Sequence, residues 1–285
     1  METLLIRIVA SRLGQIGLAK RIRWCFLIGF SLALYSGPAA SGEISAEKLT
    51  PRPGVTERVL FIKPDGPPKA SVVLFASGKG KIGVRKDGTI KNAGNFLVKT
   101  RKLFASHGLL VAVFDAPSDQ KGSDGMSGYR ITEDHAADVA AVVKRLRELA
   151  TVPIWLIGTS RGTISAANAA ARLPPPVGPD GIVLTSTVVE TGNRGQDSIH
   201  KTALERIKVP TLVFHHKKDG CYVTLWSEAK DLAKKLTAAP KVETIGVTGG
   251  ESGDVDKECK NGSHHGFKGI REEVVKQIAD WIKAN

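Results

Sequence analysis

Short apolar runs alternate with longer amphipathic stretches along most of the chain. The runs are rich in Val, Ile, Leu and Phe, as buried strands are, and they predict strands at residues 58–62, 71–76, 109–114, 153–157, 181–185, 211–215 and 241–247. The stretches between them predict helices at residues 95–106, 133–150, 162–172, 225–237 and 270–283. This alternation predicts an α/β fold with a mostly parallel central sheet flanked by helices.

The most informative motif is G-x-S-x-G at residues 158–162, which lies between the strand 153–157 and the helix 162–172. A sharp strand-to-helix turn of this kind strains the backbone of the central Ser, and the flanking glycines let neighbouring backbone pass close to it. The turn raises the Ser160 hydroxyl above the edge of the sheet. It also leaves the amide of Arg161, at the start of the helix, facing an oxyanion formed there. We therefore predict that Ser160 is a nucleophile.

A serine nucleophile needs a base, and the base needs a carboxylate that fixes its tautomer. Asp219 lies in the polar loop after the sixth predicted strand, and His265 lies in the loop between the seventh strand and the last helix. Because the carboxyl ends of parallel strands meet at one edge of a sheet, we predict a catalytic triad of Ser160, Asp219 and His265. His264 is the alternative base.

With these residues in this order, the chain resembles the α/β-hydrolase superfamily from about residue 55 to its end. The resemblance implies a serine hydrolase that cleaves a small-molecule ester, or alternatively an amide, through an acyl-enzyme on Ser160. It favours His265 over His264, because a Gly and an aromatic residue follow the catalytic histidine in this superfamily, as they do here. The segment 188–204, where this fold commonly inserts its cap, is short and predicts an open site.

The resemblance also implies a second oxyanion donor in the glycine-rich loop 77–83, and either Gly78 or Lys79 fits that role. Ser77 stands where the superfamily commonly has His, so the choice between the two amides stays open. The same loop matches G-x-G-x-x-G, which suggests a dinucleotide site as an alternative. That motif requires a helix directly after it and an acidic residue about 20 positions later. Here the segment that follows, residues 85–94, has a low propensity to form a helix. The next candidate acid at a strand end, Asp115, lies too far along the chain.

The N-terminal residues predict export. Five Lys or Arg residues precede an apolar run of 12 residues at 24–35, and small residues around Ala40 suit signal-peptide cleavage. A run of this length is too short to span a bilayer comfortably. We therefore expect a signal peptide at 1–40, a linker at 41–54 and a catalytic domain at 55–285, located in the periplasm or outside the cell. An uncleaved membrane anchor is the alternative, and no stable membrane insertion is expected after cleavage.

The chain carries a formal net charge of +13, of which +9 remains once residues 1–40 are removed. This excess could favour anionic substrates, or it could serve solubility alone. The basic residues are spread along the chain and aromatic content is only 6%, so a nucleic-acid partner is not expected. The Arg161 side chain could bind an acidic substrate group or pair with Glu190 or Asp197. A non-catalytic protein of the same fold that binds an anionic ligand is the alternative function.

Cys221 and Cys259 are the two cysteines that remain after signal cleavage. In an exported protein an even pair favours a disulfide, which would tie the Asp219 loop to the His265 loop. The His and Cys residues lack the spacing of a metal-ligand set, so we expect no metal and no cofactor. The sequence does not predict an oligomeric state.

Overall fold

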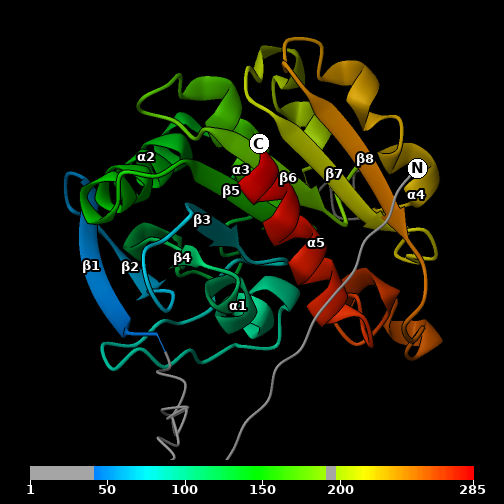
Figure 1. Ribbon diagram of the computed structural model, residues 1–285, viewed down its shortest axis with the longest axis horizontal. Coiled ribbons are helices and arrows are strands. Elements are labelled where there is room, and N and C mark those ends of the chain that lie inside the picture. Colours follow the sequence, from blue (N-terminus) through cyan, green and yellow to red (C-terminus); the bar gives the residue numbers. More distant parts are fainter. Residues whose placement is uncertain (1–41, 191–196) are drawn as a thin grey trace, which may run out of the picture. The chain divides into compact units, whose positions relative to one another are not determined.

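The computed structural model of the chain describes residues 42–190 and 197–285 (Figure 1). The predicted signal peptide, residues 1–40, lies outside the described residues, and so do residues 191–196 of the predicted cap. Within the described ranges, no helix is both long enough and apolar enough to cross a membrane.

An eight-stranded sheet with the order β1-β2-β4-β3-β5-β6-β7-β8 forms the centre of the described part. β2 runs antiparallel to both of its neighbours, whereas β4, β3, β5, β6, β7 and β8 are mutually parallel. The strands are β1 Ile44–Arg52, β2 Val55–Ile62, β3 Ala70–Phe75, β4 Leu109–Phe114, β5 Ile154–Thr159, β6 Gly181–Thr185, β7 Thr211–His216 and β8 Val242–Val247. This order brings the carboxyl ends of β3, β5, β6, β7 and β8 to one edge of the sheet.

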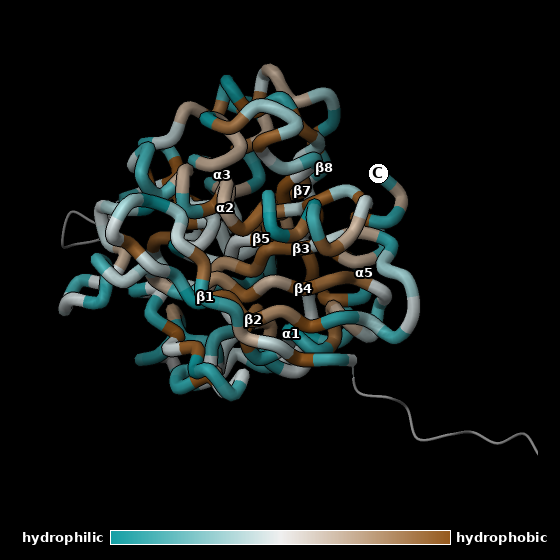
Figure 2. Tube along the Cα trace, turned by 90° about the vertical axis from the view of Figure 1, so that its left-hand side faces the viewer, coloured by the Kyte–Doolittle hydropathy of each residue, from teal (hydrophilic) through white to brown (hydrophobic). Residues whose placement is uncertain are grey.

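Helices cover both faces of the sheet (Figure 1). They are α1 Phe96–Ser106, α2 Glu133–Leu149, α3 Gly162–Arg172, α4 Trp226–Ala229 and α5 Arg271–Ala284. Apolar side chains of α2 and α3 pack with one face of the strands, and those of α1 and α5 pack with the other. Figure 2 shows the hydrophobic strands inside and hydrophilic segments around them. β3, β4, β5, β6 and β7 are buried along their whole length, which explains why they read as nearly continuous apolar runs.

Each strand predicted from the sequence forms, with ends that differ by at most three residues. One prediction is wrong: the segment 41–54 is no linker, because it contains β1, which pairs with β2 at the edge of the sheet. The side chains of β1 are exposed or only half buried, so their alternation of apolar and polar residues is weak. Pro51 and Pro53, near the end of β1, also suggested irregular backbone at this point of the sequence.

The helix expected at 225–237 is interrupted. α4 ends at Ala229, and the 3-10 helix η4 Leu232–Lys235 follows it. The amide of Asp231 bonds to the carbonyl of Glu228, three residues back, instead of continuing the four-residue spacing of an α-helix. Leu232 and Leu236 are nevertheless buried in the core, so the predicted apolar stripe persists through the change of helix type.

Candidate active site

Ser160 lies in the tight turn that joins β5 to α3. Its backbone has a φ of 53°, a left-handed conformation that is strained for a side chain other than glycine. A Cβ at Gly158 would overlap the carbonyl of Gly162, and a Cβ at Gly162 would overlap the carbonyl of Phe75 at the end of β3. Both motif glycines are therefore required by close packing of backbone against backbone. The turn that the G-x-S-x-G motif predicts is present.

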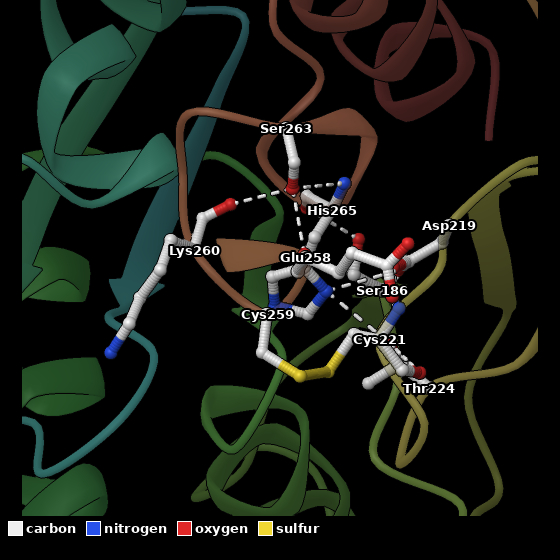
Figure 3. The surroundings of a disulfide bond; sticks show 9 residues. All are labelled: Ser186, Asp219, Cys221, Thr224, Glu258, Cys259, Lys260, Ser263 and His265. Carbon is white, nitrogen blue, oxygen red and sulfur yellow. Dashed lines mark hydrogen bonds and ion pairs between the residues drawn. A yellow bond between two sulfur atoms is a disulfide. The ribbon is translucent and has the colours of Figure 1, made fainter. Parts of the chain in front are cut away.

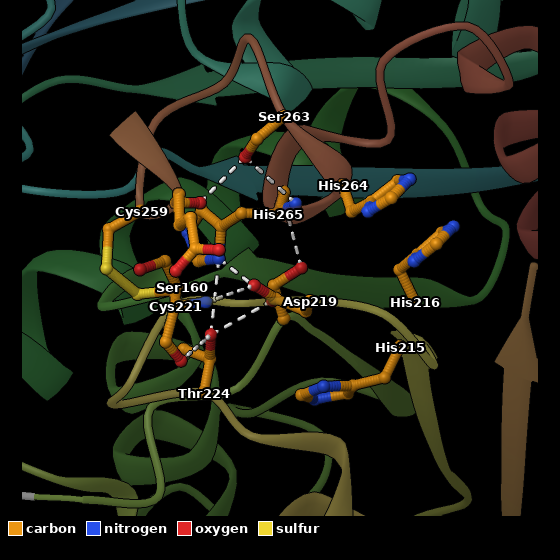
Figure 4. Close-up of polar contacts among 12 residues, drawn as sticks. Ser160, His215, His216, Asp219, Cys221, Thr224, Cys259, Ser263, His264 and His265 are labelled. Carbon is orange, nitrogen blue, oxygen red and sulfur yellow. Dashed lines mark hydrogen bonds and ion pairs between the residues drawn. A yellow bond between two sulfur atoms is a disulfide. The ribbon is translucent and has the colours of Figure 1, made fainter. Parts of the chain in front are cut away.

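Asp219 and His265 form a hydrogen-bonded pair (Figure 4). Asp219 lies just after β7, and His265 lies in the 3-10 helix η6 His264–Gly266, in the segment between β8 and α5. The distance from His265 Nδ1 to Asp219 Oδ2 is 2.9 Å, and both side chains are buried. Thr224 Oγ1 donates to the same carboxylate oxygen at 2.9 Å, and the amide of Cys221 donates to Oδ1 at 3.0 Å.

The surroundings of Asp219 keep its carboxylate ionised. Burial alone would raise its pKa, but the adjacent His265 ring, the hydrogen bond to that ring and the Cys221 amide together hold the pKa below its ordinary value. An ionised Asp219 accepts the Nδ1 proton of His265, which fixes the tautomer with Nε2 unprotonated. That tautomer is the one in which an imidazole acts as a base toward a hydroxyl.

The end of β6 connects Ser160 to this pair. The amide of Ser160 donates to the carbonyl of Thr185 at 3.0 Å, and the next residue, Ser186, donates from Oγ to the carbonyl of His265 at 2.9 Å. The three candidate triad residues therefore lie at the same edge of the sheet, after β5, β7 and β8. Ser160 is 8% exposed, and its hydroxyl makes no hydrogen bond within the described residues.

His264 has different surroundings from His265. Its ring stacks on that of His216 with centroids 4.1 Å apart, and its Nδ1 lies 3.0 Å from the carbonyl oxygen of Lys218. His215 is fully buried and its Nε2 accepts a hydrogen bond from the amide of Thr187 at 2.7 Å. Of the described histidine rings in this region, only that of His265 therefore hydrogen-bonds to the Asp219 carboxylate. No three His, Cys, Asp or Glu side chains in the described ranges are grouped as metal ligands.

Asp115 binds the glycine-rich loop that follows β3. Its carboxylate accepts hydrogen bonds from the amides of Ile82 at 2.9 Å, Gly83 at 3.1 Å and Val84 at 3.2 Å. A phosphate would need free amides of this kind, but here a carboxylate of the chain occupies them. The next helix, α1, begins only at Phe96, well beyond the G-x-G-x-x-G match. The structure thus gives the dinucleotide alternative no support.

The amides of Gly78, Lys79 and Arg161 make no hydrogen bond within the described residues, so all three are available to a ligand. Arg130 stabilises the glycine-rich loop through hydrogen bonds to its backbone. It is buried and donates to the carbonyl of Ala76 at 3.0 Å and to that of Gly78 at 3.5 Å. No sequence pattern predicts this role of Arg130, because its partners, the carbonyls of Ala76 and Gly78 and the hydroxyl of Ser165, are distant along the chain.

The predicted disulfide between Cys221 and Cys259 is present, with Cα atoms 4.5 Å apart (Figure 3). Cys221 is two residues after Asp219. On the other side, Ser263 Oγ donates to the carbonyls of Glu258 at 2.7 Å and Lys260 at 2.8 Å, and it accepts from the amide of His265 at 3.2 Å. The bridge therefore joins the loop of the acid to the loop that positions the histidine.

Comparison with known proteins gives matches among solved structures only: no protein-family model and no curated protein matches. A cold-adapted esterase from an Arctic intertidal metagenomic library shares 15% identity over 87% of this chain and 96% of its own, with a TM-score of 0.59. Dienelactone hydrolase from Anabaena variabilis shares 13% identity over 86% of this chain and 98% of its own, with a TM-score of 0.60. A lidless α/β serine hydrolase from Xanthomonas campestris shares 14% identity over 85% of this chain and 98% of its own, with a TM-score of 0.52. The chain has the α/β-hydrolase fold.

In this fold the cap is commonly inserted after the strand that here is β6. The described residues between β6 and β7 form two short 3-10 helices, η2 Ile199–Lys201 and η3 Leu204–Arg206, and Ile199 and Leu204 pack into the core of the sheet. The described part of this segment therefore belongs to the main body of the domain.

Proposed function

We propose that the protein is a serine hydrolase that cleaves carboxylic esters through an acyl-enzyme on Ser160. The observation that carries the proposal is the buried Asp219–His265 hydrogen bond at the sheet edge that also presents Ser160 in a strained turn. The structural neighbours, which include an esterase, a dienelactone hydrolase and a serine hydrolase, agree with this reaction class. The short cap favours small, accessible esters over substrates that need a deep tunnel, and an amide is the alternative bond.

In the proposed reaction, His265 Nε2 takes the proton of Ser160 as its oxygen attacks the ester carbonyl. The charge that develops on the carbonyl oxygen is stabilised by the amide of Arg161 and by that of Gly78 or Lys79. His265 then protonates the leaving alcohol, while the ionised Asp219 stabilises the imidazolium. Water, activated by the same histidine, finally hydrolyses the acyl-enzyme. The cycle needs no electron or group from a cofactor.

Ser160→Ala tests the proposal. The substitution removes the nucleophile, so we expect the turnover of 4-nitrophenyl acetate to fall by a factor on the order of 10⁴, as in triad deletions. Ser106→Ala is the matched control, because Ser106 is an exposed residue at the end of α1. Equal thermal melting of both variants would establish that they fold. Unchanged turnover by the Ser160 variant would refute the mechanism.

We also propose that the mature protein acts in the periplasm or outside the cell. The arrangement of charged, apolar and small residues in segment 1–40 and the disulfide between Cys221 and Cys259 support this location, because disulfides persist in oxidising compartments. N-terminal sequencing of protein recovered from the cell envelope or the medium would then begin near residue 41. A chain that keeps Met1 and stays in the cytoplasm would contradict the proposal.

A further inference from the structure

Arg161, the residue directly after Ser160, carries a guanidinium that forms no ion pair within residues 42–190 and 197–285. The side chain is half buried, and burial lowers its pKa, while the charges of Tyr222 and Asp197 raise that pKa by less. Its one described hydrogen bond is a long one, 3.4 Å from Nη1 to Ser127 Oγ, and it forms no ion pair within the described residues. The sequence left Glu190 and Asp197 open as partners, but neither is paired with it, and the carboxylate of Asp197 binds Lys201 at 3.1 Å.

A second uncompensated guanidinium lies nearby. Arg130 is fully buried, and its described hydrogen bonds go only to the carbonyls of Ala76 and Gly78 and to the hydroxyl of Ser165. Burial and then the charge of Arg161 lower the pKa of Arg130 to about 9. Removing such charges from water without an anionic partner costs free energy. Both guanidinium groups lie near the edge of the sheet that carries Ser160. An anion bound there would offset the free-energy cost of burying them.

The space beside the glycine-rich loop is polar as well. A hollow of about 560 Å³ borders this loop, and it is lined in part by Ser77, Lys79, Lys81, Asn92, Asn95 and Asn261. Amide and ammonium groups suit a polar ester better than a long aliphatic chain, which would need an apolar wall. Of its two lysines, Lys81 donates from Nζ to the carbonyls of Lys121 and Gly122, so Lys79 supplies the positive charge next to the candidate oxyanion amides.

We propose that the ester attacked by Ser160 carries a carboxylate, and that the Arg161 guanidinium binds it. This inference rests on the proposed function and names its substrate class. The planar guanidinium fork matches a carboxylate with two parallel hydrogen bonds, which a neutral ester cannot form. Because Arg161 is adjacent to the nucleophile, the carboxylate of the substrate lies a few atoms from the scissile bond. Arg130 contributes positive potential without touching the substrate.

Two pairs of matched esters test the inference. 4-Nitrophenyl hydrogen glutarate and 4-nitrophenyl pentanoate differ by a charge on the acyl side, and the acetates of 3-(4-hydroxyphenyl)propionate and of 4-propylphenol differ by a charge on the alcohol side. We expect kcat/KM to favour the anionic member of at least one pair by tenfold or more. In Arg161→Gln this ratio should fall at least tenfold, mainly through KM, and Arg161→Lys should give an intermediate ratio.

Arg206→Gln is the matched control, since Arg206 is exposed in η3 and its loss changes the net charge equally. It should keep the wild-type ratio. Equal kcat/KM values for both members of both pairs would overturn the inference, as would an unchanged ratio in Arg161→Gln. Hydrolysis of the neutral esters would still support the proposed function in either case.

If no ester is cleaved, the proposed function fails. Calorimetric titration with glutarate then decides the anion site: binding that Arg161→Gln abolishes supports it, and no binding overturns it.

Discussion

The neighbouring histidines of η6 show how one position separates a candidate base from a surface residue. His265 is buried and bonded to Asp219, whereas His264 is partly exposed and stacked on His216. Thr224 strengthens the difference, because its hydroxyl donates to Asp219 and lies 3.2 Å from Nδ1 of His265. Among the described residues, only the His265 ring therefore has both the orientation and the charged partner that a general base needs.

We expect His265→Ala to lose ester hydrolysis by several orders of magnitude, because no other described imidazole contacts Asp219. His264→Ala should keep substantial activity and serves as the matched control. Stopped-flow measurement of the acylation burst with a 4-nitrophenyl ester distinguishes them. An inactive His264 variant beside an active His265 variant would reverse the assignment.

At the scale of elements, strands and turns were predictable where the residues themselves encode them. β3, β4, β5, β6 and β7 are buried and mostly apolar, and β8 is half buried. Ser160, Asp219 and His265 follow β5, β7 and β8, so their common edge could be inferred. β1 was missed because an edge strand with half-buried side chains has little apolar periodicity. Arg130 was missed because its partners are distant along the chain, and Thr224 was missed because its bond to Asp219 depends on how the loop after β7 folds back, which no local pattern encodes.

The Cys221–Cys259 bridge adds a covalent link between two loops that also meet through the Asp219–His265 hydrogen bond and through the contact of His264 Nδ1 with the carbonyl of Lys218. A closed segment with a sequence separation of 38 residues restricts the unfolded chain by about 4 kcal/mol on the loop-entropy model. Cys221→Ser/Cys259→Ser should therefore melt at a lower temperature than the wild type. Its kcat should also fall at temperatures where circular dichroism shows a folded protein.

Reductant provides the control for this prediction. It should lower the melting temperature of the wild-type protein toward that of the double variant and leave the double variant unchanged. A double variant with wild-type kcat would show that the bridge does not position the catalytic loops. Two free thiols in the non-reduced protein, found by mass spectrometry, would contradict the bridge itself.

At the scale of the whole molecule, buried ionisable groups set the response to acid. Burial lowers the pKa of His215 to about 4, so the folded protein keeps this ring neutral, while the unfolded chain titrates at about 6.5. Its contribution to stability is present above the unfolded value and is lost as the pH falls from about 6.5 to about 4. Asp219 acts at lower pH: its folded pKa is depressed, so its contribution is present above about 3.9 and is lost as the pH falls through the folded value.

We expect the free energy of unfolding to drop by about 3 kcal/mol between pH 7 and pH 4 on account of His215. In His215→Gln the side-chain oxygen can still accept the Thr187 amide but cannot titrate, so the melting temperature should depend less on pH over this range. Thermal melts of both proteins at several pH values measure the difference. Parallel curves for the two proteins would contradict the assignment of this acid sensitivity to His215.

The proposed function requires Ser160 to be an activated nucleophile. A fluorophosphonate probe reacts with a serine hydroxyl only where a base and an oxyanion site activate it, so it tests the nucleophile without knowledge of the substrate. We expect one adduct per chain on the purified protein, located on Ser160 by mass spectrometry and lost in both Ser160→Ala and His265→Ala. No adduct on the folded wild-type protein, or equal labelling of Ser160→Ala, would contradict the account.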